Sequence, residues 1–398
     1  MNKQKTIQHI ALLLLSISYL LFVRCSDESM GEEQTVFSGQ QEAPDTNSLI
    51  EEKIYDAKSI DGPYLINGTV ITVDLNEQIR KEALDRDTVT VWINAAEERF
   101  NVPLKTEFSV EPALYDMPER LIAISDIEGN FTAFSSFLQA NQVLNERFQW
   151  TFGRGHLVLV GDFVDRGEDV LQTLWLIYKL EEEAKQSGGQ VHFLLGNHEI
   201  MNIQGDFRYV QDKYKKLAIA IGNKNQKEEN YTILFSTDSH LGLWLRSKNI
   251  VERIGDYLFT HAGLSPNILP LDISIDEINQ IIRANIDRGL YKNPNGDEKA
   301  SFLMGVESPF WYRGLITDYT YYDKIKEQEL DAILTRYKAK TTVVGHSIVE
   351  DISYDFQKKV LRMDVKHGRK KGSTQTKGVL IERGQVYKVD AAGGKERL

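Results

Sequence analysis

The sequence predicts an α/β protein whose main domain is a central sheet flanked by helices, preceded by a small β extension. Three observations favour this class. From Arg120 onward, short apolar runs alternate with amphipathic stretches of helical period, which is typical of alternating strands and helices. Before that point, apolar and polar residues alternate as in half-buried strands. The length of 398 residues and the hydrophobic content of 41% suffice for one large core with additions.

Residues 1–25 are predicted to be a targeting segment. Lys3 and Lys5 precede the apolar stretch Ile10–Val23, and this order is typical of an export signal. Cys25 is the only cysteine of the sequence, and its position after the apolar stretch predicts the lipidation site of a bacterial lipoprotein. An uncleaved signal anchor is the alternative, because the apolar run is nearly long enough to span a bilayer. Both interpretations place the protein in the cell envelope, exported and membrane-tethered, either periplasmic or at the cell surface.

The next two segments differ in composition. Residues 26–53 are polar and acidic, and we expect a disordered tether because such a segment cannot form a core. Residues 54–118 contain alternating stretches separated by Gly, Asn and Asp, which predict a small β extension against the main domain. The predicted strands are Pro63–Ile66, Thr69–Leu75, Thr88–Ile93 and Arg99–Leu104.

Residues 119–398 carry the strand and helix signals of the main domain. Phe131–Leu144, Val170–Lys185 and Ile273–Asn285 have the periodicity of helices. Apolar runs predict strands at Leu121–Ile124, Leu157–Val160, Val191–Leu195, Tyr257–Thr260 and Thr341–Val344. Three later strands are expected to close a second sheet: Lys359–Met363, Gly378–Glu382 and Gln385–Val389.

Polar motifs end or follow five of these apolar runs. They are SDIEGN (125–130), GDFVDRG (161–167), GNHE (196–199), THAG (260–263) and VVGH (343–346). In an open α/β sheet, the loops at the carboxyl ends of strands line the ligand crevice, so the motifs are expected to converge. Each motif supplies a carboxylate, an amide or an imidazole, which are side chains that bind divalent metals. The convergent candidates are Asp126, Asp162, Asn197, His261 and His346. Two metals held in this way can clamp a phosphate ester and activate water.

The motifs resemble those of the calcineurin-like metallophosphoesterases, in particular the phosphoprotein phosphatase branch. GDFVDRG and GNHE carry this resemblance. The longer run GNHEIMNIQGDFRYV (196–210) and the later SPFWYRG (308–314) resemble the Shewanella-like protein phosphatases within that branch. The resemblance covers residues 119–383, and it implies a metallophosphoesterase fold over 119–398, in which helices flank a central β-sandwich.

The resemblance also implies a metal-dependent phosphatase that hydrolyses phosphate monoesters, including phosphorylated Ser, Thr or Tyr of proteins. Its cofactors would be two divalent metal ions, with Mn²⁺ favoured and Fe, Zn or Mg as alternatives. The implied metal ligands are Asp126 and Glu128 at the first metal, Asp162 as the bridge, and Asn197, His261 and His346 at the second. His198 would be the general acid and Asp165 its orienting carboxylate.

Two arginines are candidate ligands of the substrate phosphate. Arg166 matches the family position, and guanidinium binds phosphate through two parallel hydrogen bonds. Its simpler alternative is an ion pair with a nearby carboxylate such as Asp169. Arg313 in SPFWYRG is either a second phosphate ligand or a structural cation stacked beside neighbouring aromatic residues, and both interpretations stay open.

Glu128 departs from the family pattern. GDxHG places a metal-binding histidine where SDIEGN has Glu128. A carboxylate is a competent ligand and adds one negative charge, which favours Mn²⁺ or Mg²⁺ over Zn²⁺. The competing hypothesis is that Glu128 disables the first metal site and leaves a catalytically silent phosphate-binding module of the envelope. A further alternative is a symmetrical dinucleoside tetraphosphate hydrolase, because those enzymes carry very similar motifs.

The charge balance excludes one class of partner. The formal net charge of −11 and the pI of about 5.4 argue against a nucleic-acid-binding face. A local basic group is interpreted as a solvated loop: Lys366, Arg369, Lys370, Lys371 and Lys377. The histidines without motif support are interpreted as structural or surface residues: His156, His192, His240 and His367. The expected partners are therefore a phosphorylated substrate and a membrane, the latter through the N-terminal anchor.

Overall fold

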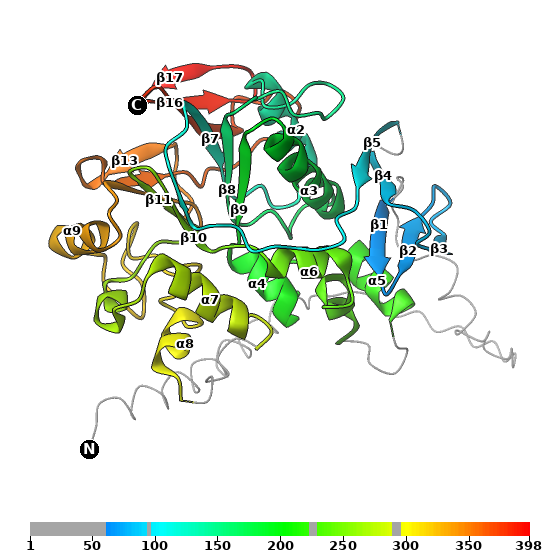
Figure 1. Cartoon of the computed structure of the whole chain (residues 1–398), viewed down its shortest axis with the longest axis horizontal. Coiled ribbons are helices and arrows are strands. Elements are labelled where there is room, and N and C mark those ends of the chain that lie inside the picture. Colours follow the sequence, from blue (N-terminus) through cyan, green and yellow to red (C-terminus); the bar gives the residue numbers. More distant parts are fainter. Residues whose placement is uncertain (1–60, 94–96, 223–228, 289–295) are drawn as a thin grey trace, which may run out of the picture. The chain divides into compact units, whose positions relative to one another are not determined.

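The computed structural model describes residues 61–93, 97–222, 229–288 and 296–398 (Figure 1). The described residues belong to one compact unit. The predicted leader with Cys25 and the predicted tether lie outside the described residues. No described helix combines the length and the apolar composition that a membrane span requires.

The first of two six-stranded sheets contains the strands that precede SDIEGN, GDFVDRG and GNHE. Its order is β17 (Lys395–Arg397), β16 (Gln385–Asp390), β15 (Lys377–Glu382), β7 (Arg120–Ile124), β8 (His156–Val160) and β9 (Gln190–Leu194). β7, β8 and β9 are parallel, so their carboxyl ends lie at the same edge.

The second sheet contains the strands that precede THAG and VVGH. Its order is β13 (Ser353–Asp355), β14 (Val360–Arg362), β12 (Thr341–Val344), β11 (Tyr257–Thr260), β10 (Val251–Ile254) and β6 (Leu114–Tyr115). β11, β12 and β14 are parallel, so their carboxyl ends also share an edge.

The two sheets pack face to face. One apolar core joins buried side chains of both sheets, among them Leu121, Val158 and Leu194 from the first and Phe259, Val343 and Leu361 from the second. Helices α2 (Phe131–Ala140) and α3 (Val170–Gln186) cover the other face of the first sheet (Figure 1). Their apolar side chains pack into the core, and Phe134 of α2 and Trp175 of α3 are completely buried. The predicted β-sandwich flanked by helices is thus confirmed.

The predicted strands after VVGH are present, but their predicted assignment to one second sheet was wrong. Only β14 joins the second sheet. β15 pairs antiparallel with β7, and β16 pairs with β15. The physical reason is that β7 would otherwise present an unpaired edge of backbone groups beside its buried neighbour β8.

The predicted N-terminal extension, residues 54–118, contains the predicted strands and two more, β3 and β6, of which β6 joins the second sheet. β1 (Asp61–Ile66), β2 (Thr69–Val73) and β3 (Ile79–Ala83) form one sheet, and β4 (Thr88–Ile93) pairs with β5 (Glu98–Pro103). β3 escaped prediction because its sequence IRKEA is mostly exposed and shows no apolar alternation. The extension rests on α3, where Trp175 Nε1 donates to the Pro63 carbonyl (2.9 Å) and the Lys105 amide donates to Tyr178 Oη (2.6 Å).

Six further α-helices complete the described residues: α4 (Asn197–Gln204), α5 (Asp212–Ile221), α6 (His240–Arg246), α7 (Ile275–Asn285), α8 (Glu298–Leu303) and α9 (Glu327–Arg336). α7 confirms the predicted helix and begins at a capping box. Ser274 Oγ accepts the Glu277 amide (3.2 Å), and the Glu277 carboxylate accepts the Ser274 amide (2.8 Å). α4 begins at Asn197, so the GNHE motif is the start of a helix.

Candidate active site

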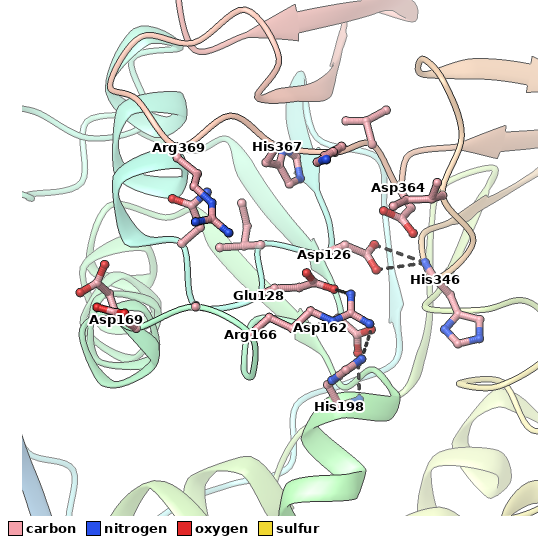
Figure 2. Close-up of a pocket in the computed structure, with 18 of the residues that line it drawn as sticks. Asp126, Glu128, Asp162, Arg166, Asp169, His198, His346, Asp364, His367 and Arg369 are labelled. Atoms are coloured by element: carbon pink, nitrogen blue, oxygen red, sulfur yellow. Dashed lines mark hydrogen bonds and ion pairs between the residues drawn. The ribbon is translucent and has the colours of Figure 1, made fainter. Parts of the chain in front are cut away.

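The motif residues converge on one cavity of about 760 Å³ at the carboxyl ends of the parallel strands. Figure 2 shows carboxylates, imidazoles and guanidinium groups that reach this cavity from separate loops. Its lining includes these predicted residues: Asp126, Glu128, Asp162, Arg166, Asn197, His198, Arg313 and His346. His261 lies beneath the lining and is completely buried.

The backbone that carries these residues is unusual. The φ angles of six site residues lie in the left-handed region: Asp126 (53°), Glu128 (49°), Asp162 (61°), Asp165 (68°), Arg166 (55°) and His346 (63°). Residues other than glycine rarely adopt such angles, and each costs free energy unless the surrounding structure supports it. These three loops therefore turn sharply after their strands, and five of the six side chains, all but Asp165, line the cavity.

Asp162, His261 and His346 form a candidate metal-binding group, with one ligand atom from each lying within 4.8 Å of the others. His261 Nε2 lies 3.0 Å from Asp162 Oδ2 and 3.1 Å from Asn197 Oδ1. His261 Nδ1 donates to the Val160 carbonyl (2.8 Å), which leaves the Nε2 lone pair for a metal. His346 Nε2 donates to the Trp311 carbonyl (3.2 Å), so its free lone pair is on Nδ1.

Gly196 permits this approach of the GNHE loop to Asp162. A Cβ at Gly196 would lie 2.2 Å from Asp162 Oδ1, which is closer than any real contact. The His198 amide donates to the same Oδ1 (2.9 Å). Only glycine fits at the first position of GNHE, because any larger side chain would collide with Asp162.

Asp126, Glu128 and Asp364 make the neighbouring part of the cavity acidic. Burial, and then the charge of Asp364, raise the pKa of Asp126 well above its ordinary value. Burial raises the pKa of Asp364 to about 6. Carboxylates that share a buried site are stabilised by a cation. Together with the imidazoles and Asn197, this donor set fits Mn²⁺, Fe or Zn, which supports the expectation of divalent metals.

His198 is held in one orientation by a buried chain of hydrogen bonds. Its Nδ1 lies 2.6 Å from Asp165 Oδ2, and Asn202 donates to Asp165 Oδ1 (2.8 Å). The Tyr231 hydroxyl donates to Asn202 Oδ1 (2.5 Å). Burial would lower the pKa of His198, but the carboxylates of Asp162 and Asp165 outweigh it and raise the pKa to about 9. The raised pKa favours the protonated imidazole, and His198 Nε2 lies 3.8 Å from Asp162 Oδ2.

Arg166 pairs with Glu128 rather than with Asp169. Its guanidinium also lies over the Tyr209 ring, 5.2 Å from the centroid, and Tyr209 in turn packs against His198. Burial, opposed by Arg166, raises the pKa of Glu128 to about 7. The residue that departs from the family pattern therefore contacts the predicted phosphate ligand directly.

Arg313 lines the cavity while its Nη1 donates to the His346 carbonyl (2.8 Å) and to Ser347 Oγ (3.1 Å). These contacts position the loop that carries His346. They leave other guanidinium nitrogens for a ligand, so both interpretations of Arg313 stay compatible with the geometry.

Glu199, the last residue of GNHE, has a structural role. Its buried carboxylate accepts the backbone amides of Gly196 (2.8 Å), Asp162 (3.0 Å) and Phe163 (2.7 Å). One side chain thereby fastens the GDFVDRG loop to the GNHE loop. These hydrogen bonds fix the position of the two motif loops relative to each other.

Sequence reasoning missed Asp364. This residue lies two positions after β14, and it lines the same cavity as Asp126. The signal was present, because the predicted strand Lys359–Met363 ends directly before it and the strand-end rule applies equally there. His367 was interpreted as structural or surface, yet it also lines the cavity while its Nε2 donates to the Ser125 carbonyl (2.8 Å).

The other three histidines without motif support are buried or partly buried and make side-chain contacts away from the cavity. His192 Nδ1 lies 2.6 Å from Glu252 Oε2, and its Nε2 lies 2.9 Å from His156 Nδ1. His240 Nε2 contacts the Tyr178 hydroxyl (3.0 Å) beneath the N-terminal extension. Neither group lines the cavity described above.

Comparisons with known proteins agree with this geometry. A family model described as calcineurin-like phosphoesterase matches residues 119–350. Shewanella-like protein phosphatase 2 of Arabidopsis thaliana is 27% identical over 295 residues, which cover 65% of this chain and 73% of that protein. Shewanella-like protein phosphatase 1 of Plasmodium berghei is 29% identical over 228 residues. These residues cover 57% of this chain and 61% of that protein.

A solved structure is also similar over most of the chain. The cold-active protein-tyrosine phosphatase of a psychrophilic Shewanella species is 30% identical and superimposes with a TM-score of 0.75, covering 85% of this chain and 99% of its own. The family model spans more than half of the sequence and contains all five motifs. The chain is therefore a hydrolase that belongs to the calcineurin-like phosphoesterase family.

Proposed function

We propose that this protein hydrolyses phosphate monoesters and acts as a phosphoprotein phosphatase on phosphorylated Ser, Thr or Tyr. The observation that carries the proposal is the position of His198. The His198 imidazole, oriented by Asp165, lines the same cavity as Asp162, His346 and Arg166. A proton donor beside metal ligands and a phosphate-binding cation is the arrangement that phosphate ester hydrolysis requires. The names of the similar proteins, protein phosphatases and a protein-tyrosine phosphatase, support the same substrate class.

Two divalent metal ions would be held by the carboxylates, the amide and the imidazoles of the site. Asp126 and Glu128 would bind the first, Asn197, His261 and His346 the second, and Asp162 would contact both. When bound, such ions neutralise phosphate charge and lower the pKa of a water molecule for attack on phosphorus. The oxygen-rich first site favours Mn²⁺ or Mg²⁺ there.

The chain itself supplies orientation and a proton. Arg166, with Arg313 as a further candidate, binds the non-bridging phosphate oxygens and fixes the direction of attack. As the bond between phosphorus and the leaving oxygen breaks, His198 Nε2 donates its proton to that oxygen. The Asp165 carboxylate stabilises the imidazolium until this transfer, as in other His–carboxylate pairs.

The test uses the metal-reconstituted protein with p-nitrophenyl phosphate and with phosphopeptides. We expect His198→Ala and Asp162→Asn each to lower kcat by at least about a hundredfold, the range of a lost general acid or metal ligand. Asp165→Asn should lower kcat less and leave metal content unchanged, because Asp165 acts through His198. Full activity in His198→Ala and Asp162→Asn would refute the proposal.

A symmetrical dinucleoside tetraphosphate hydrolase is the second candidate. The observation in its favour is the size of the cavity together with its four lining cations, which would suit a polyphosphate: Arg166, Arg313, Lys366 and Arg369. Product analysis separates the two functions. Release of nucleoside diphosphate from diadenosine tetraphosphate at a higher kcat/KM than any phosphopeptide would favour this candidate.

The silent phosphate-binding module makes a different prediction. If Glu128 disables the first site, Glu128→His would create turnover in a protein that has none. If the protein is an active phosphatase, the same substitution changes only the metal preference or the rate. Metal content measured on the same samples decides between the two, because the silent module would hold fewer than two metals.

A further inference from the structure

The cavity is larger than one phosphate requires. Its volume of about 760 Å³ lies within the ~300–1,000 Å³ typical of pockets that enclose a whole drug-sized ligand. In Figure 2, His346 and Asp364 lie at one end, Glu128 and Arg166 in the middle, and Arg369 at the far end. A phosphate held between Arg166 and the metal ligands would therefore leave the Arg369 end for another part of the substrate.

The loop between β14 and β15 carries two cations that line the cavity, and Figure 2 shows Arg369 at its far end. Lys366 and Arg369 are exposed and line the cavity, whereas Lys370 and Lys371 of the same loop do not. Neither Lys366 nor Arg369 forms an ion pair with another of the described residues. Six carboxylates also line this cavity, so two cations without an ion-pair partner can attract an anionic group only on their own side of it.

The loop is fastened in place. Asn130 Nδ2 donates to the Gly368 carbonyl (3.0 Å), and its Oδ1 accepts the Ala133 amide at the start of α2 (3.1 Å). His367 Nε2 donates to the Ser125 carbonyl, next to Asp126. The backbone between the two cations is thus tied to the same loop that carries a predicted metal ligand. Such preorganisation lowers the entropic cost of binding.

The charges opposite the loop restrict where an anion binds. Glu168 and Asp169 also line the cavity, and Figure 2 shows Asp169 on the wall across from Arg369. An anionic group is repelled from that wall and attracted to Lys366 and Arg369. The binding position is therefore on the loop side of the cavity, beyond the phosphate at Arg166.

We propose that Lys366 and Arg369 form a second anion subsite, which selects phosphorylated peptide segments that carry another negative group near the scissile phosphate. The inference rests on the proposed phosphatase function and names its substrate class. The second group is a carboxylate of Asp or Glu or a second phosphate, because a guanidinium binds both through paired hydrogen bonds. The exposure of Lys366 and Arg369 agrees with the sequence interpretation of a solvated loop, and the proposal adds a role in substrate selection.

The test compares phosphopeptides of one length that differ only next to the phosphorylated residue: Ala, Asp or a second phosphoserine. The measured quantity is kcat/KM for each anionic peptide divided by kcat/KM for the Ala peptide. We expect a ratio of about five to ten, the size of one charge-assisted contact at a partly exposed site. The Asp and phosphoserine arms identify which anion the subsite prefers.

Variants locate the effect. Arg369→Ala and Lys366→Ala should bring the ratio close to one, and Arg369→Glu should make a Lys-flanked peptide the better substrate. Lys371→Ala is the matched control, since it removes the same charge from the same loop without touching the cavity, and it should keep both the ratio and the rate of the wild-type protein. A ratio near one in the wild-type protein, or an equal loss in Lys371→Ala, would overturn the proposal.

Failure of the subsite and failure of the proposed function give different results. Turnover of p-nitrophenyl phosphate by the wild-type protein without any preference among the peptides refutes the subsite alone. Absence of turnover on every phosphate ester refutes the phosphatase function. In that case, binding of the same peptides to the metal-loaded protein, measured by fluorescence anisotropy, still tests whether Lys366 and Arg369 prefer anions.

Discussion

The ion pair between Glu128 and Arg166 makes a prediction about phosphate affinity. A phosphate that binds Arg166 must compete with the Glu128 carboxylate, so Glu128→Gln should strengthen phosphate binding to the metal-free protein. Arg166 and Glu128 are 48% and 24% exposed at their side chains, so the pair is partly screened by solvent. Pairs of this kind contribute about 0.5–1 kcal/mol, which corresponds to a twofold to fivefold lower Kd.

The assay is isothermal titration of inorganic phosphate into chelator-treated protein. Glu128→Gln, Arg166→Ala and the double variant form a cycle that separates the pair from the general effect of one negative charge. The gain in Glu128→Gln should vanish when Arg166 is absent. An equal gain in the Arg166→Ala background would refute the reasoning, because it would show a long-range charge effect. The affinity for Mn²⁺ should change in the opposite direction. Glu128→Gln removes a carboxylate ligand and should therefore weaken Mn²⁺ binding.

Three further predictions concern the scaffold, the effect of pH and the leader. Glu199→Ala should lower the free energy of unfolding by about 3–5 kcal/mol in urea denaturation, because it leaves buried amides of both motif loops without an acceptor; a loss below about 1 kcal/mol would contradict the fastening role. Burial, aided by Lys105, lowers the pKa of His240 to about 4, so folded His240 is neutral where the unfolded imidazole, with a pKa near ~6.5, binds a proton. Stability should therefore fall as the pH drops from about 6.5 toward 4, by about 1–2 kcal/mol after allowance for its partial exposure, and His240→Gln should flatten this part of the urea-denaturation profile. Cys25→Ser should abolish fatty-acid labelling and detergent partitioning if the leader is that of a lipoprotein, whereas unchanged partitioning would indicate an uncleaved anchor.

Much of the site was predictable because its ligands obey a local rule. Asp126, Asp162, Asn197, His261 and His346 each follow an apolar run, and parallel strands place such residues at one edge of a sheet. The same rule would have found Asp364. The N-terminal strand β3 was not predictable, because a mostly exposed strand shows no alternation.

Sequence alone determined the order of strands and helices, the family and the identity of the candidate ligands, since these depend on residues close together in the chain. Tertiary structure decided which side chains meet. Glu128 and Arg166 are 38 positions apart, and Asn130 and Gly368 are 238 apart, so their contacts form only when the sheets and loops assemble. For the same reason the pairing of β15 with β7, and the placement of Lys366 and Arg369 at the cavity, could not be predicted from local patterns. Hydrophobic periodicity specifies which face of an element is buried, but the partner across that face is chosen by packing and backbone pairing between distant segments.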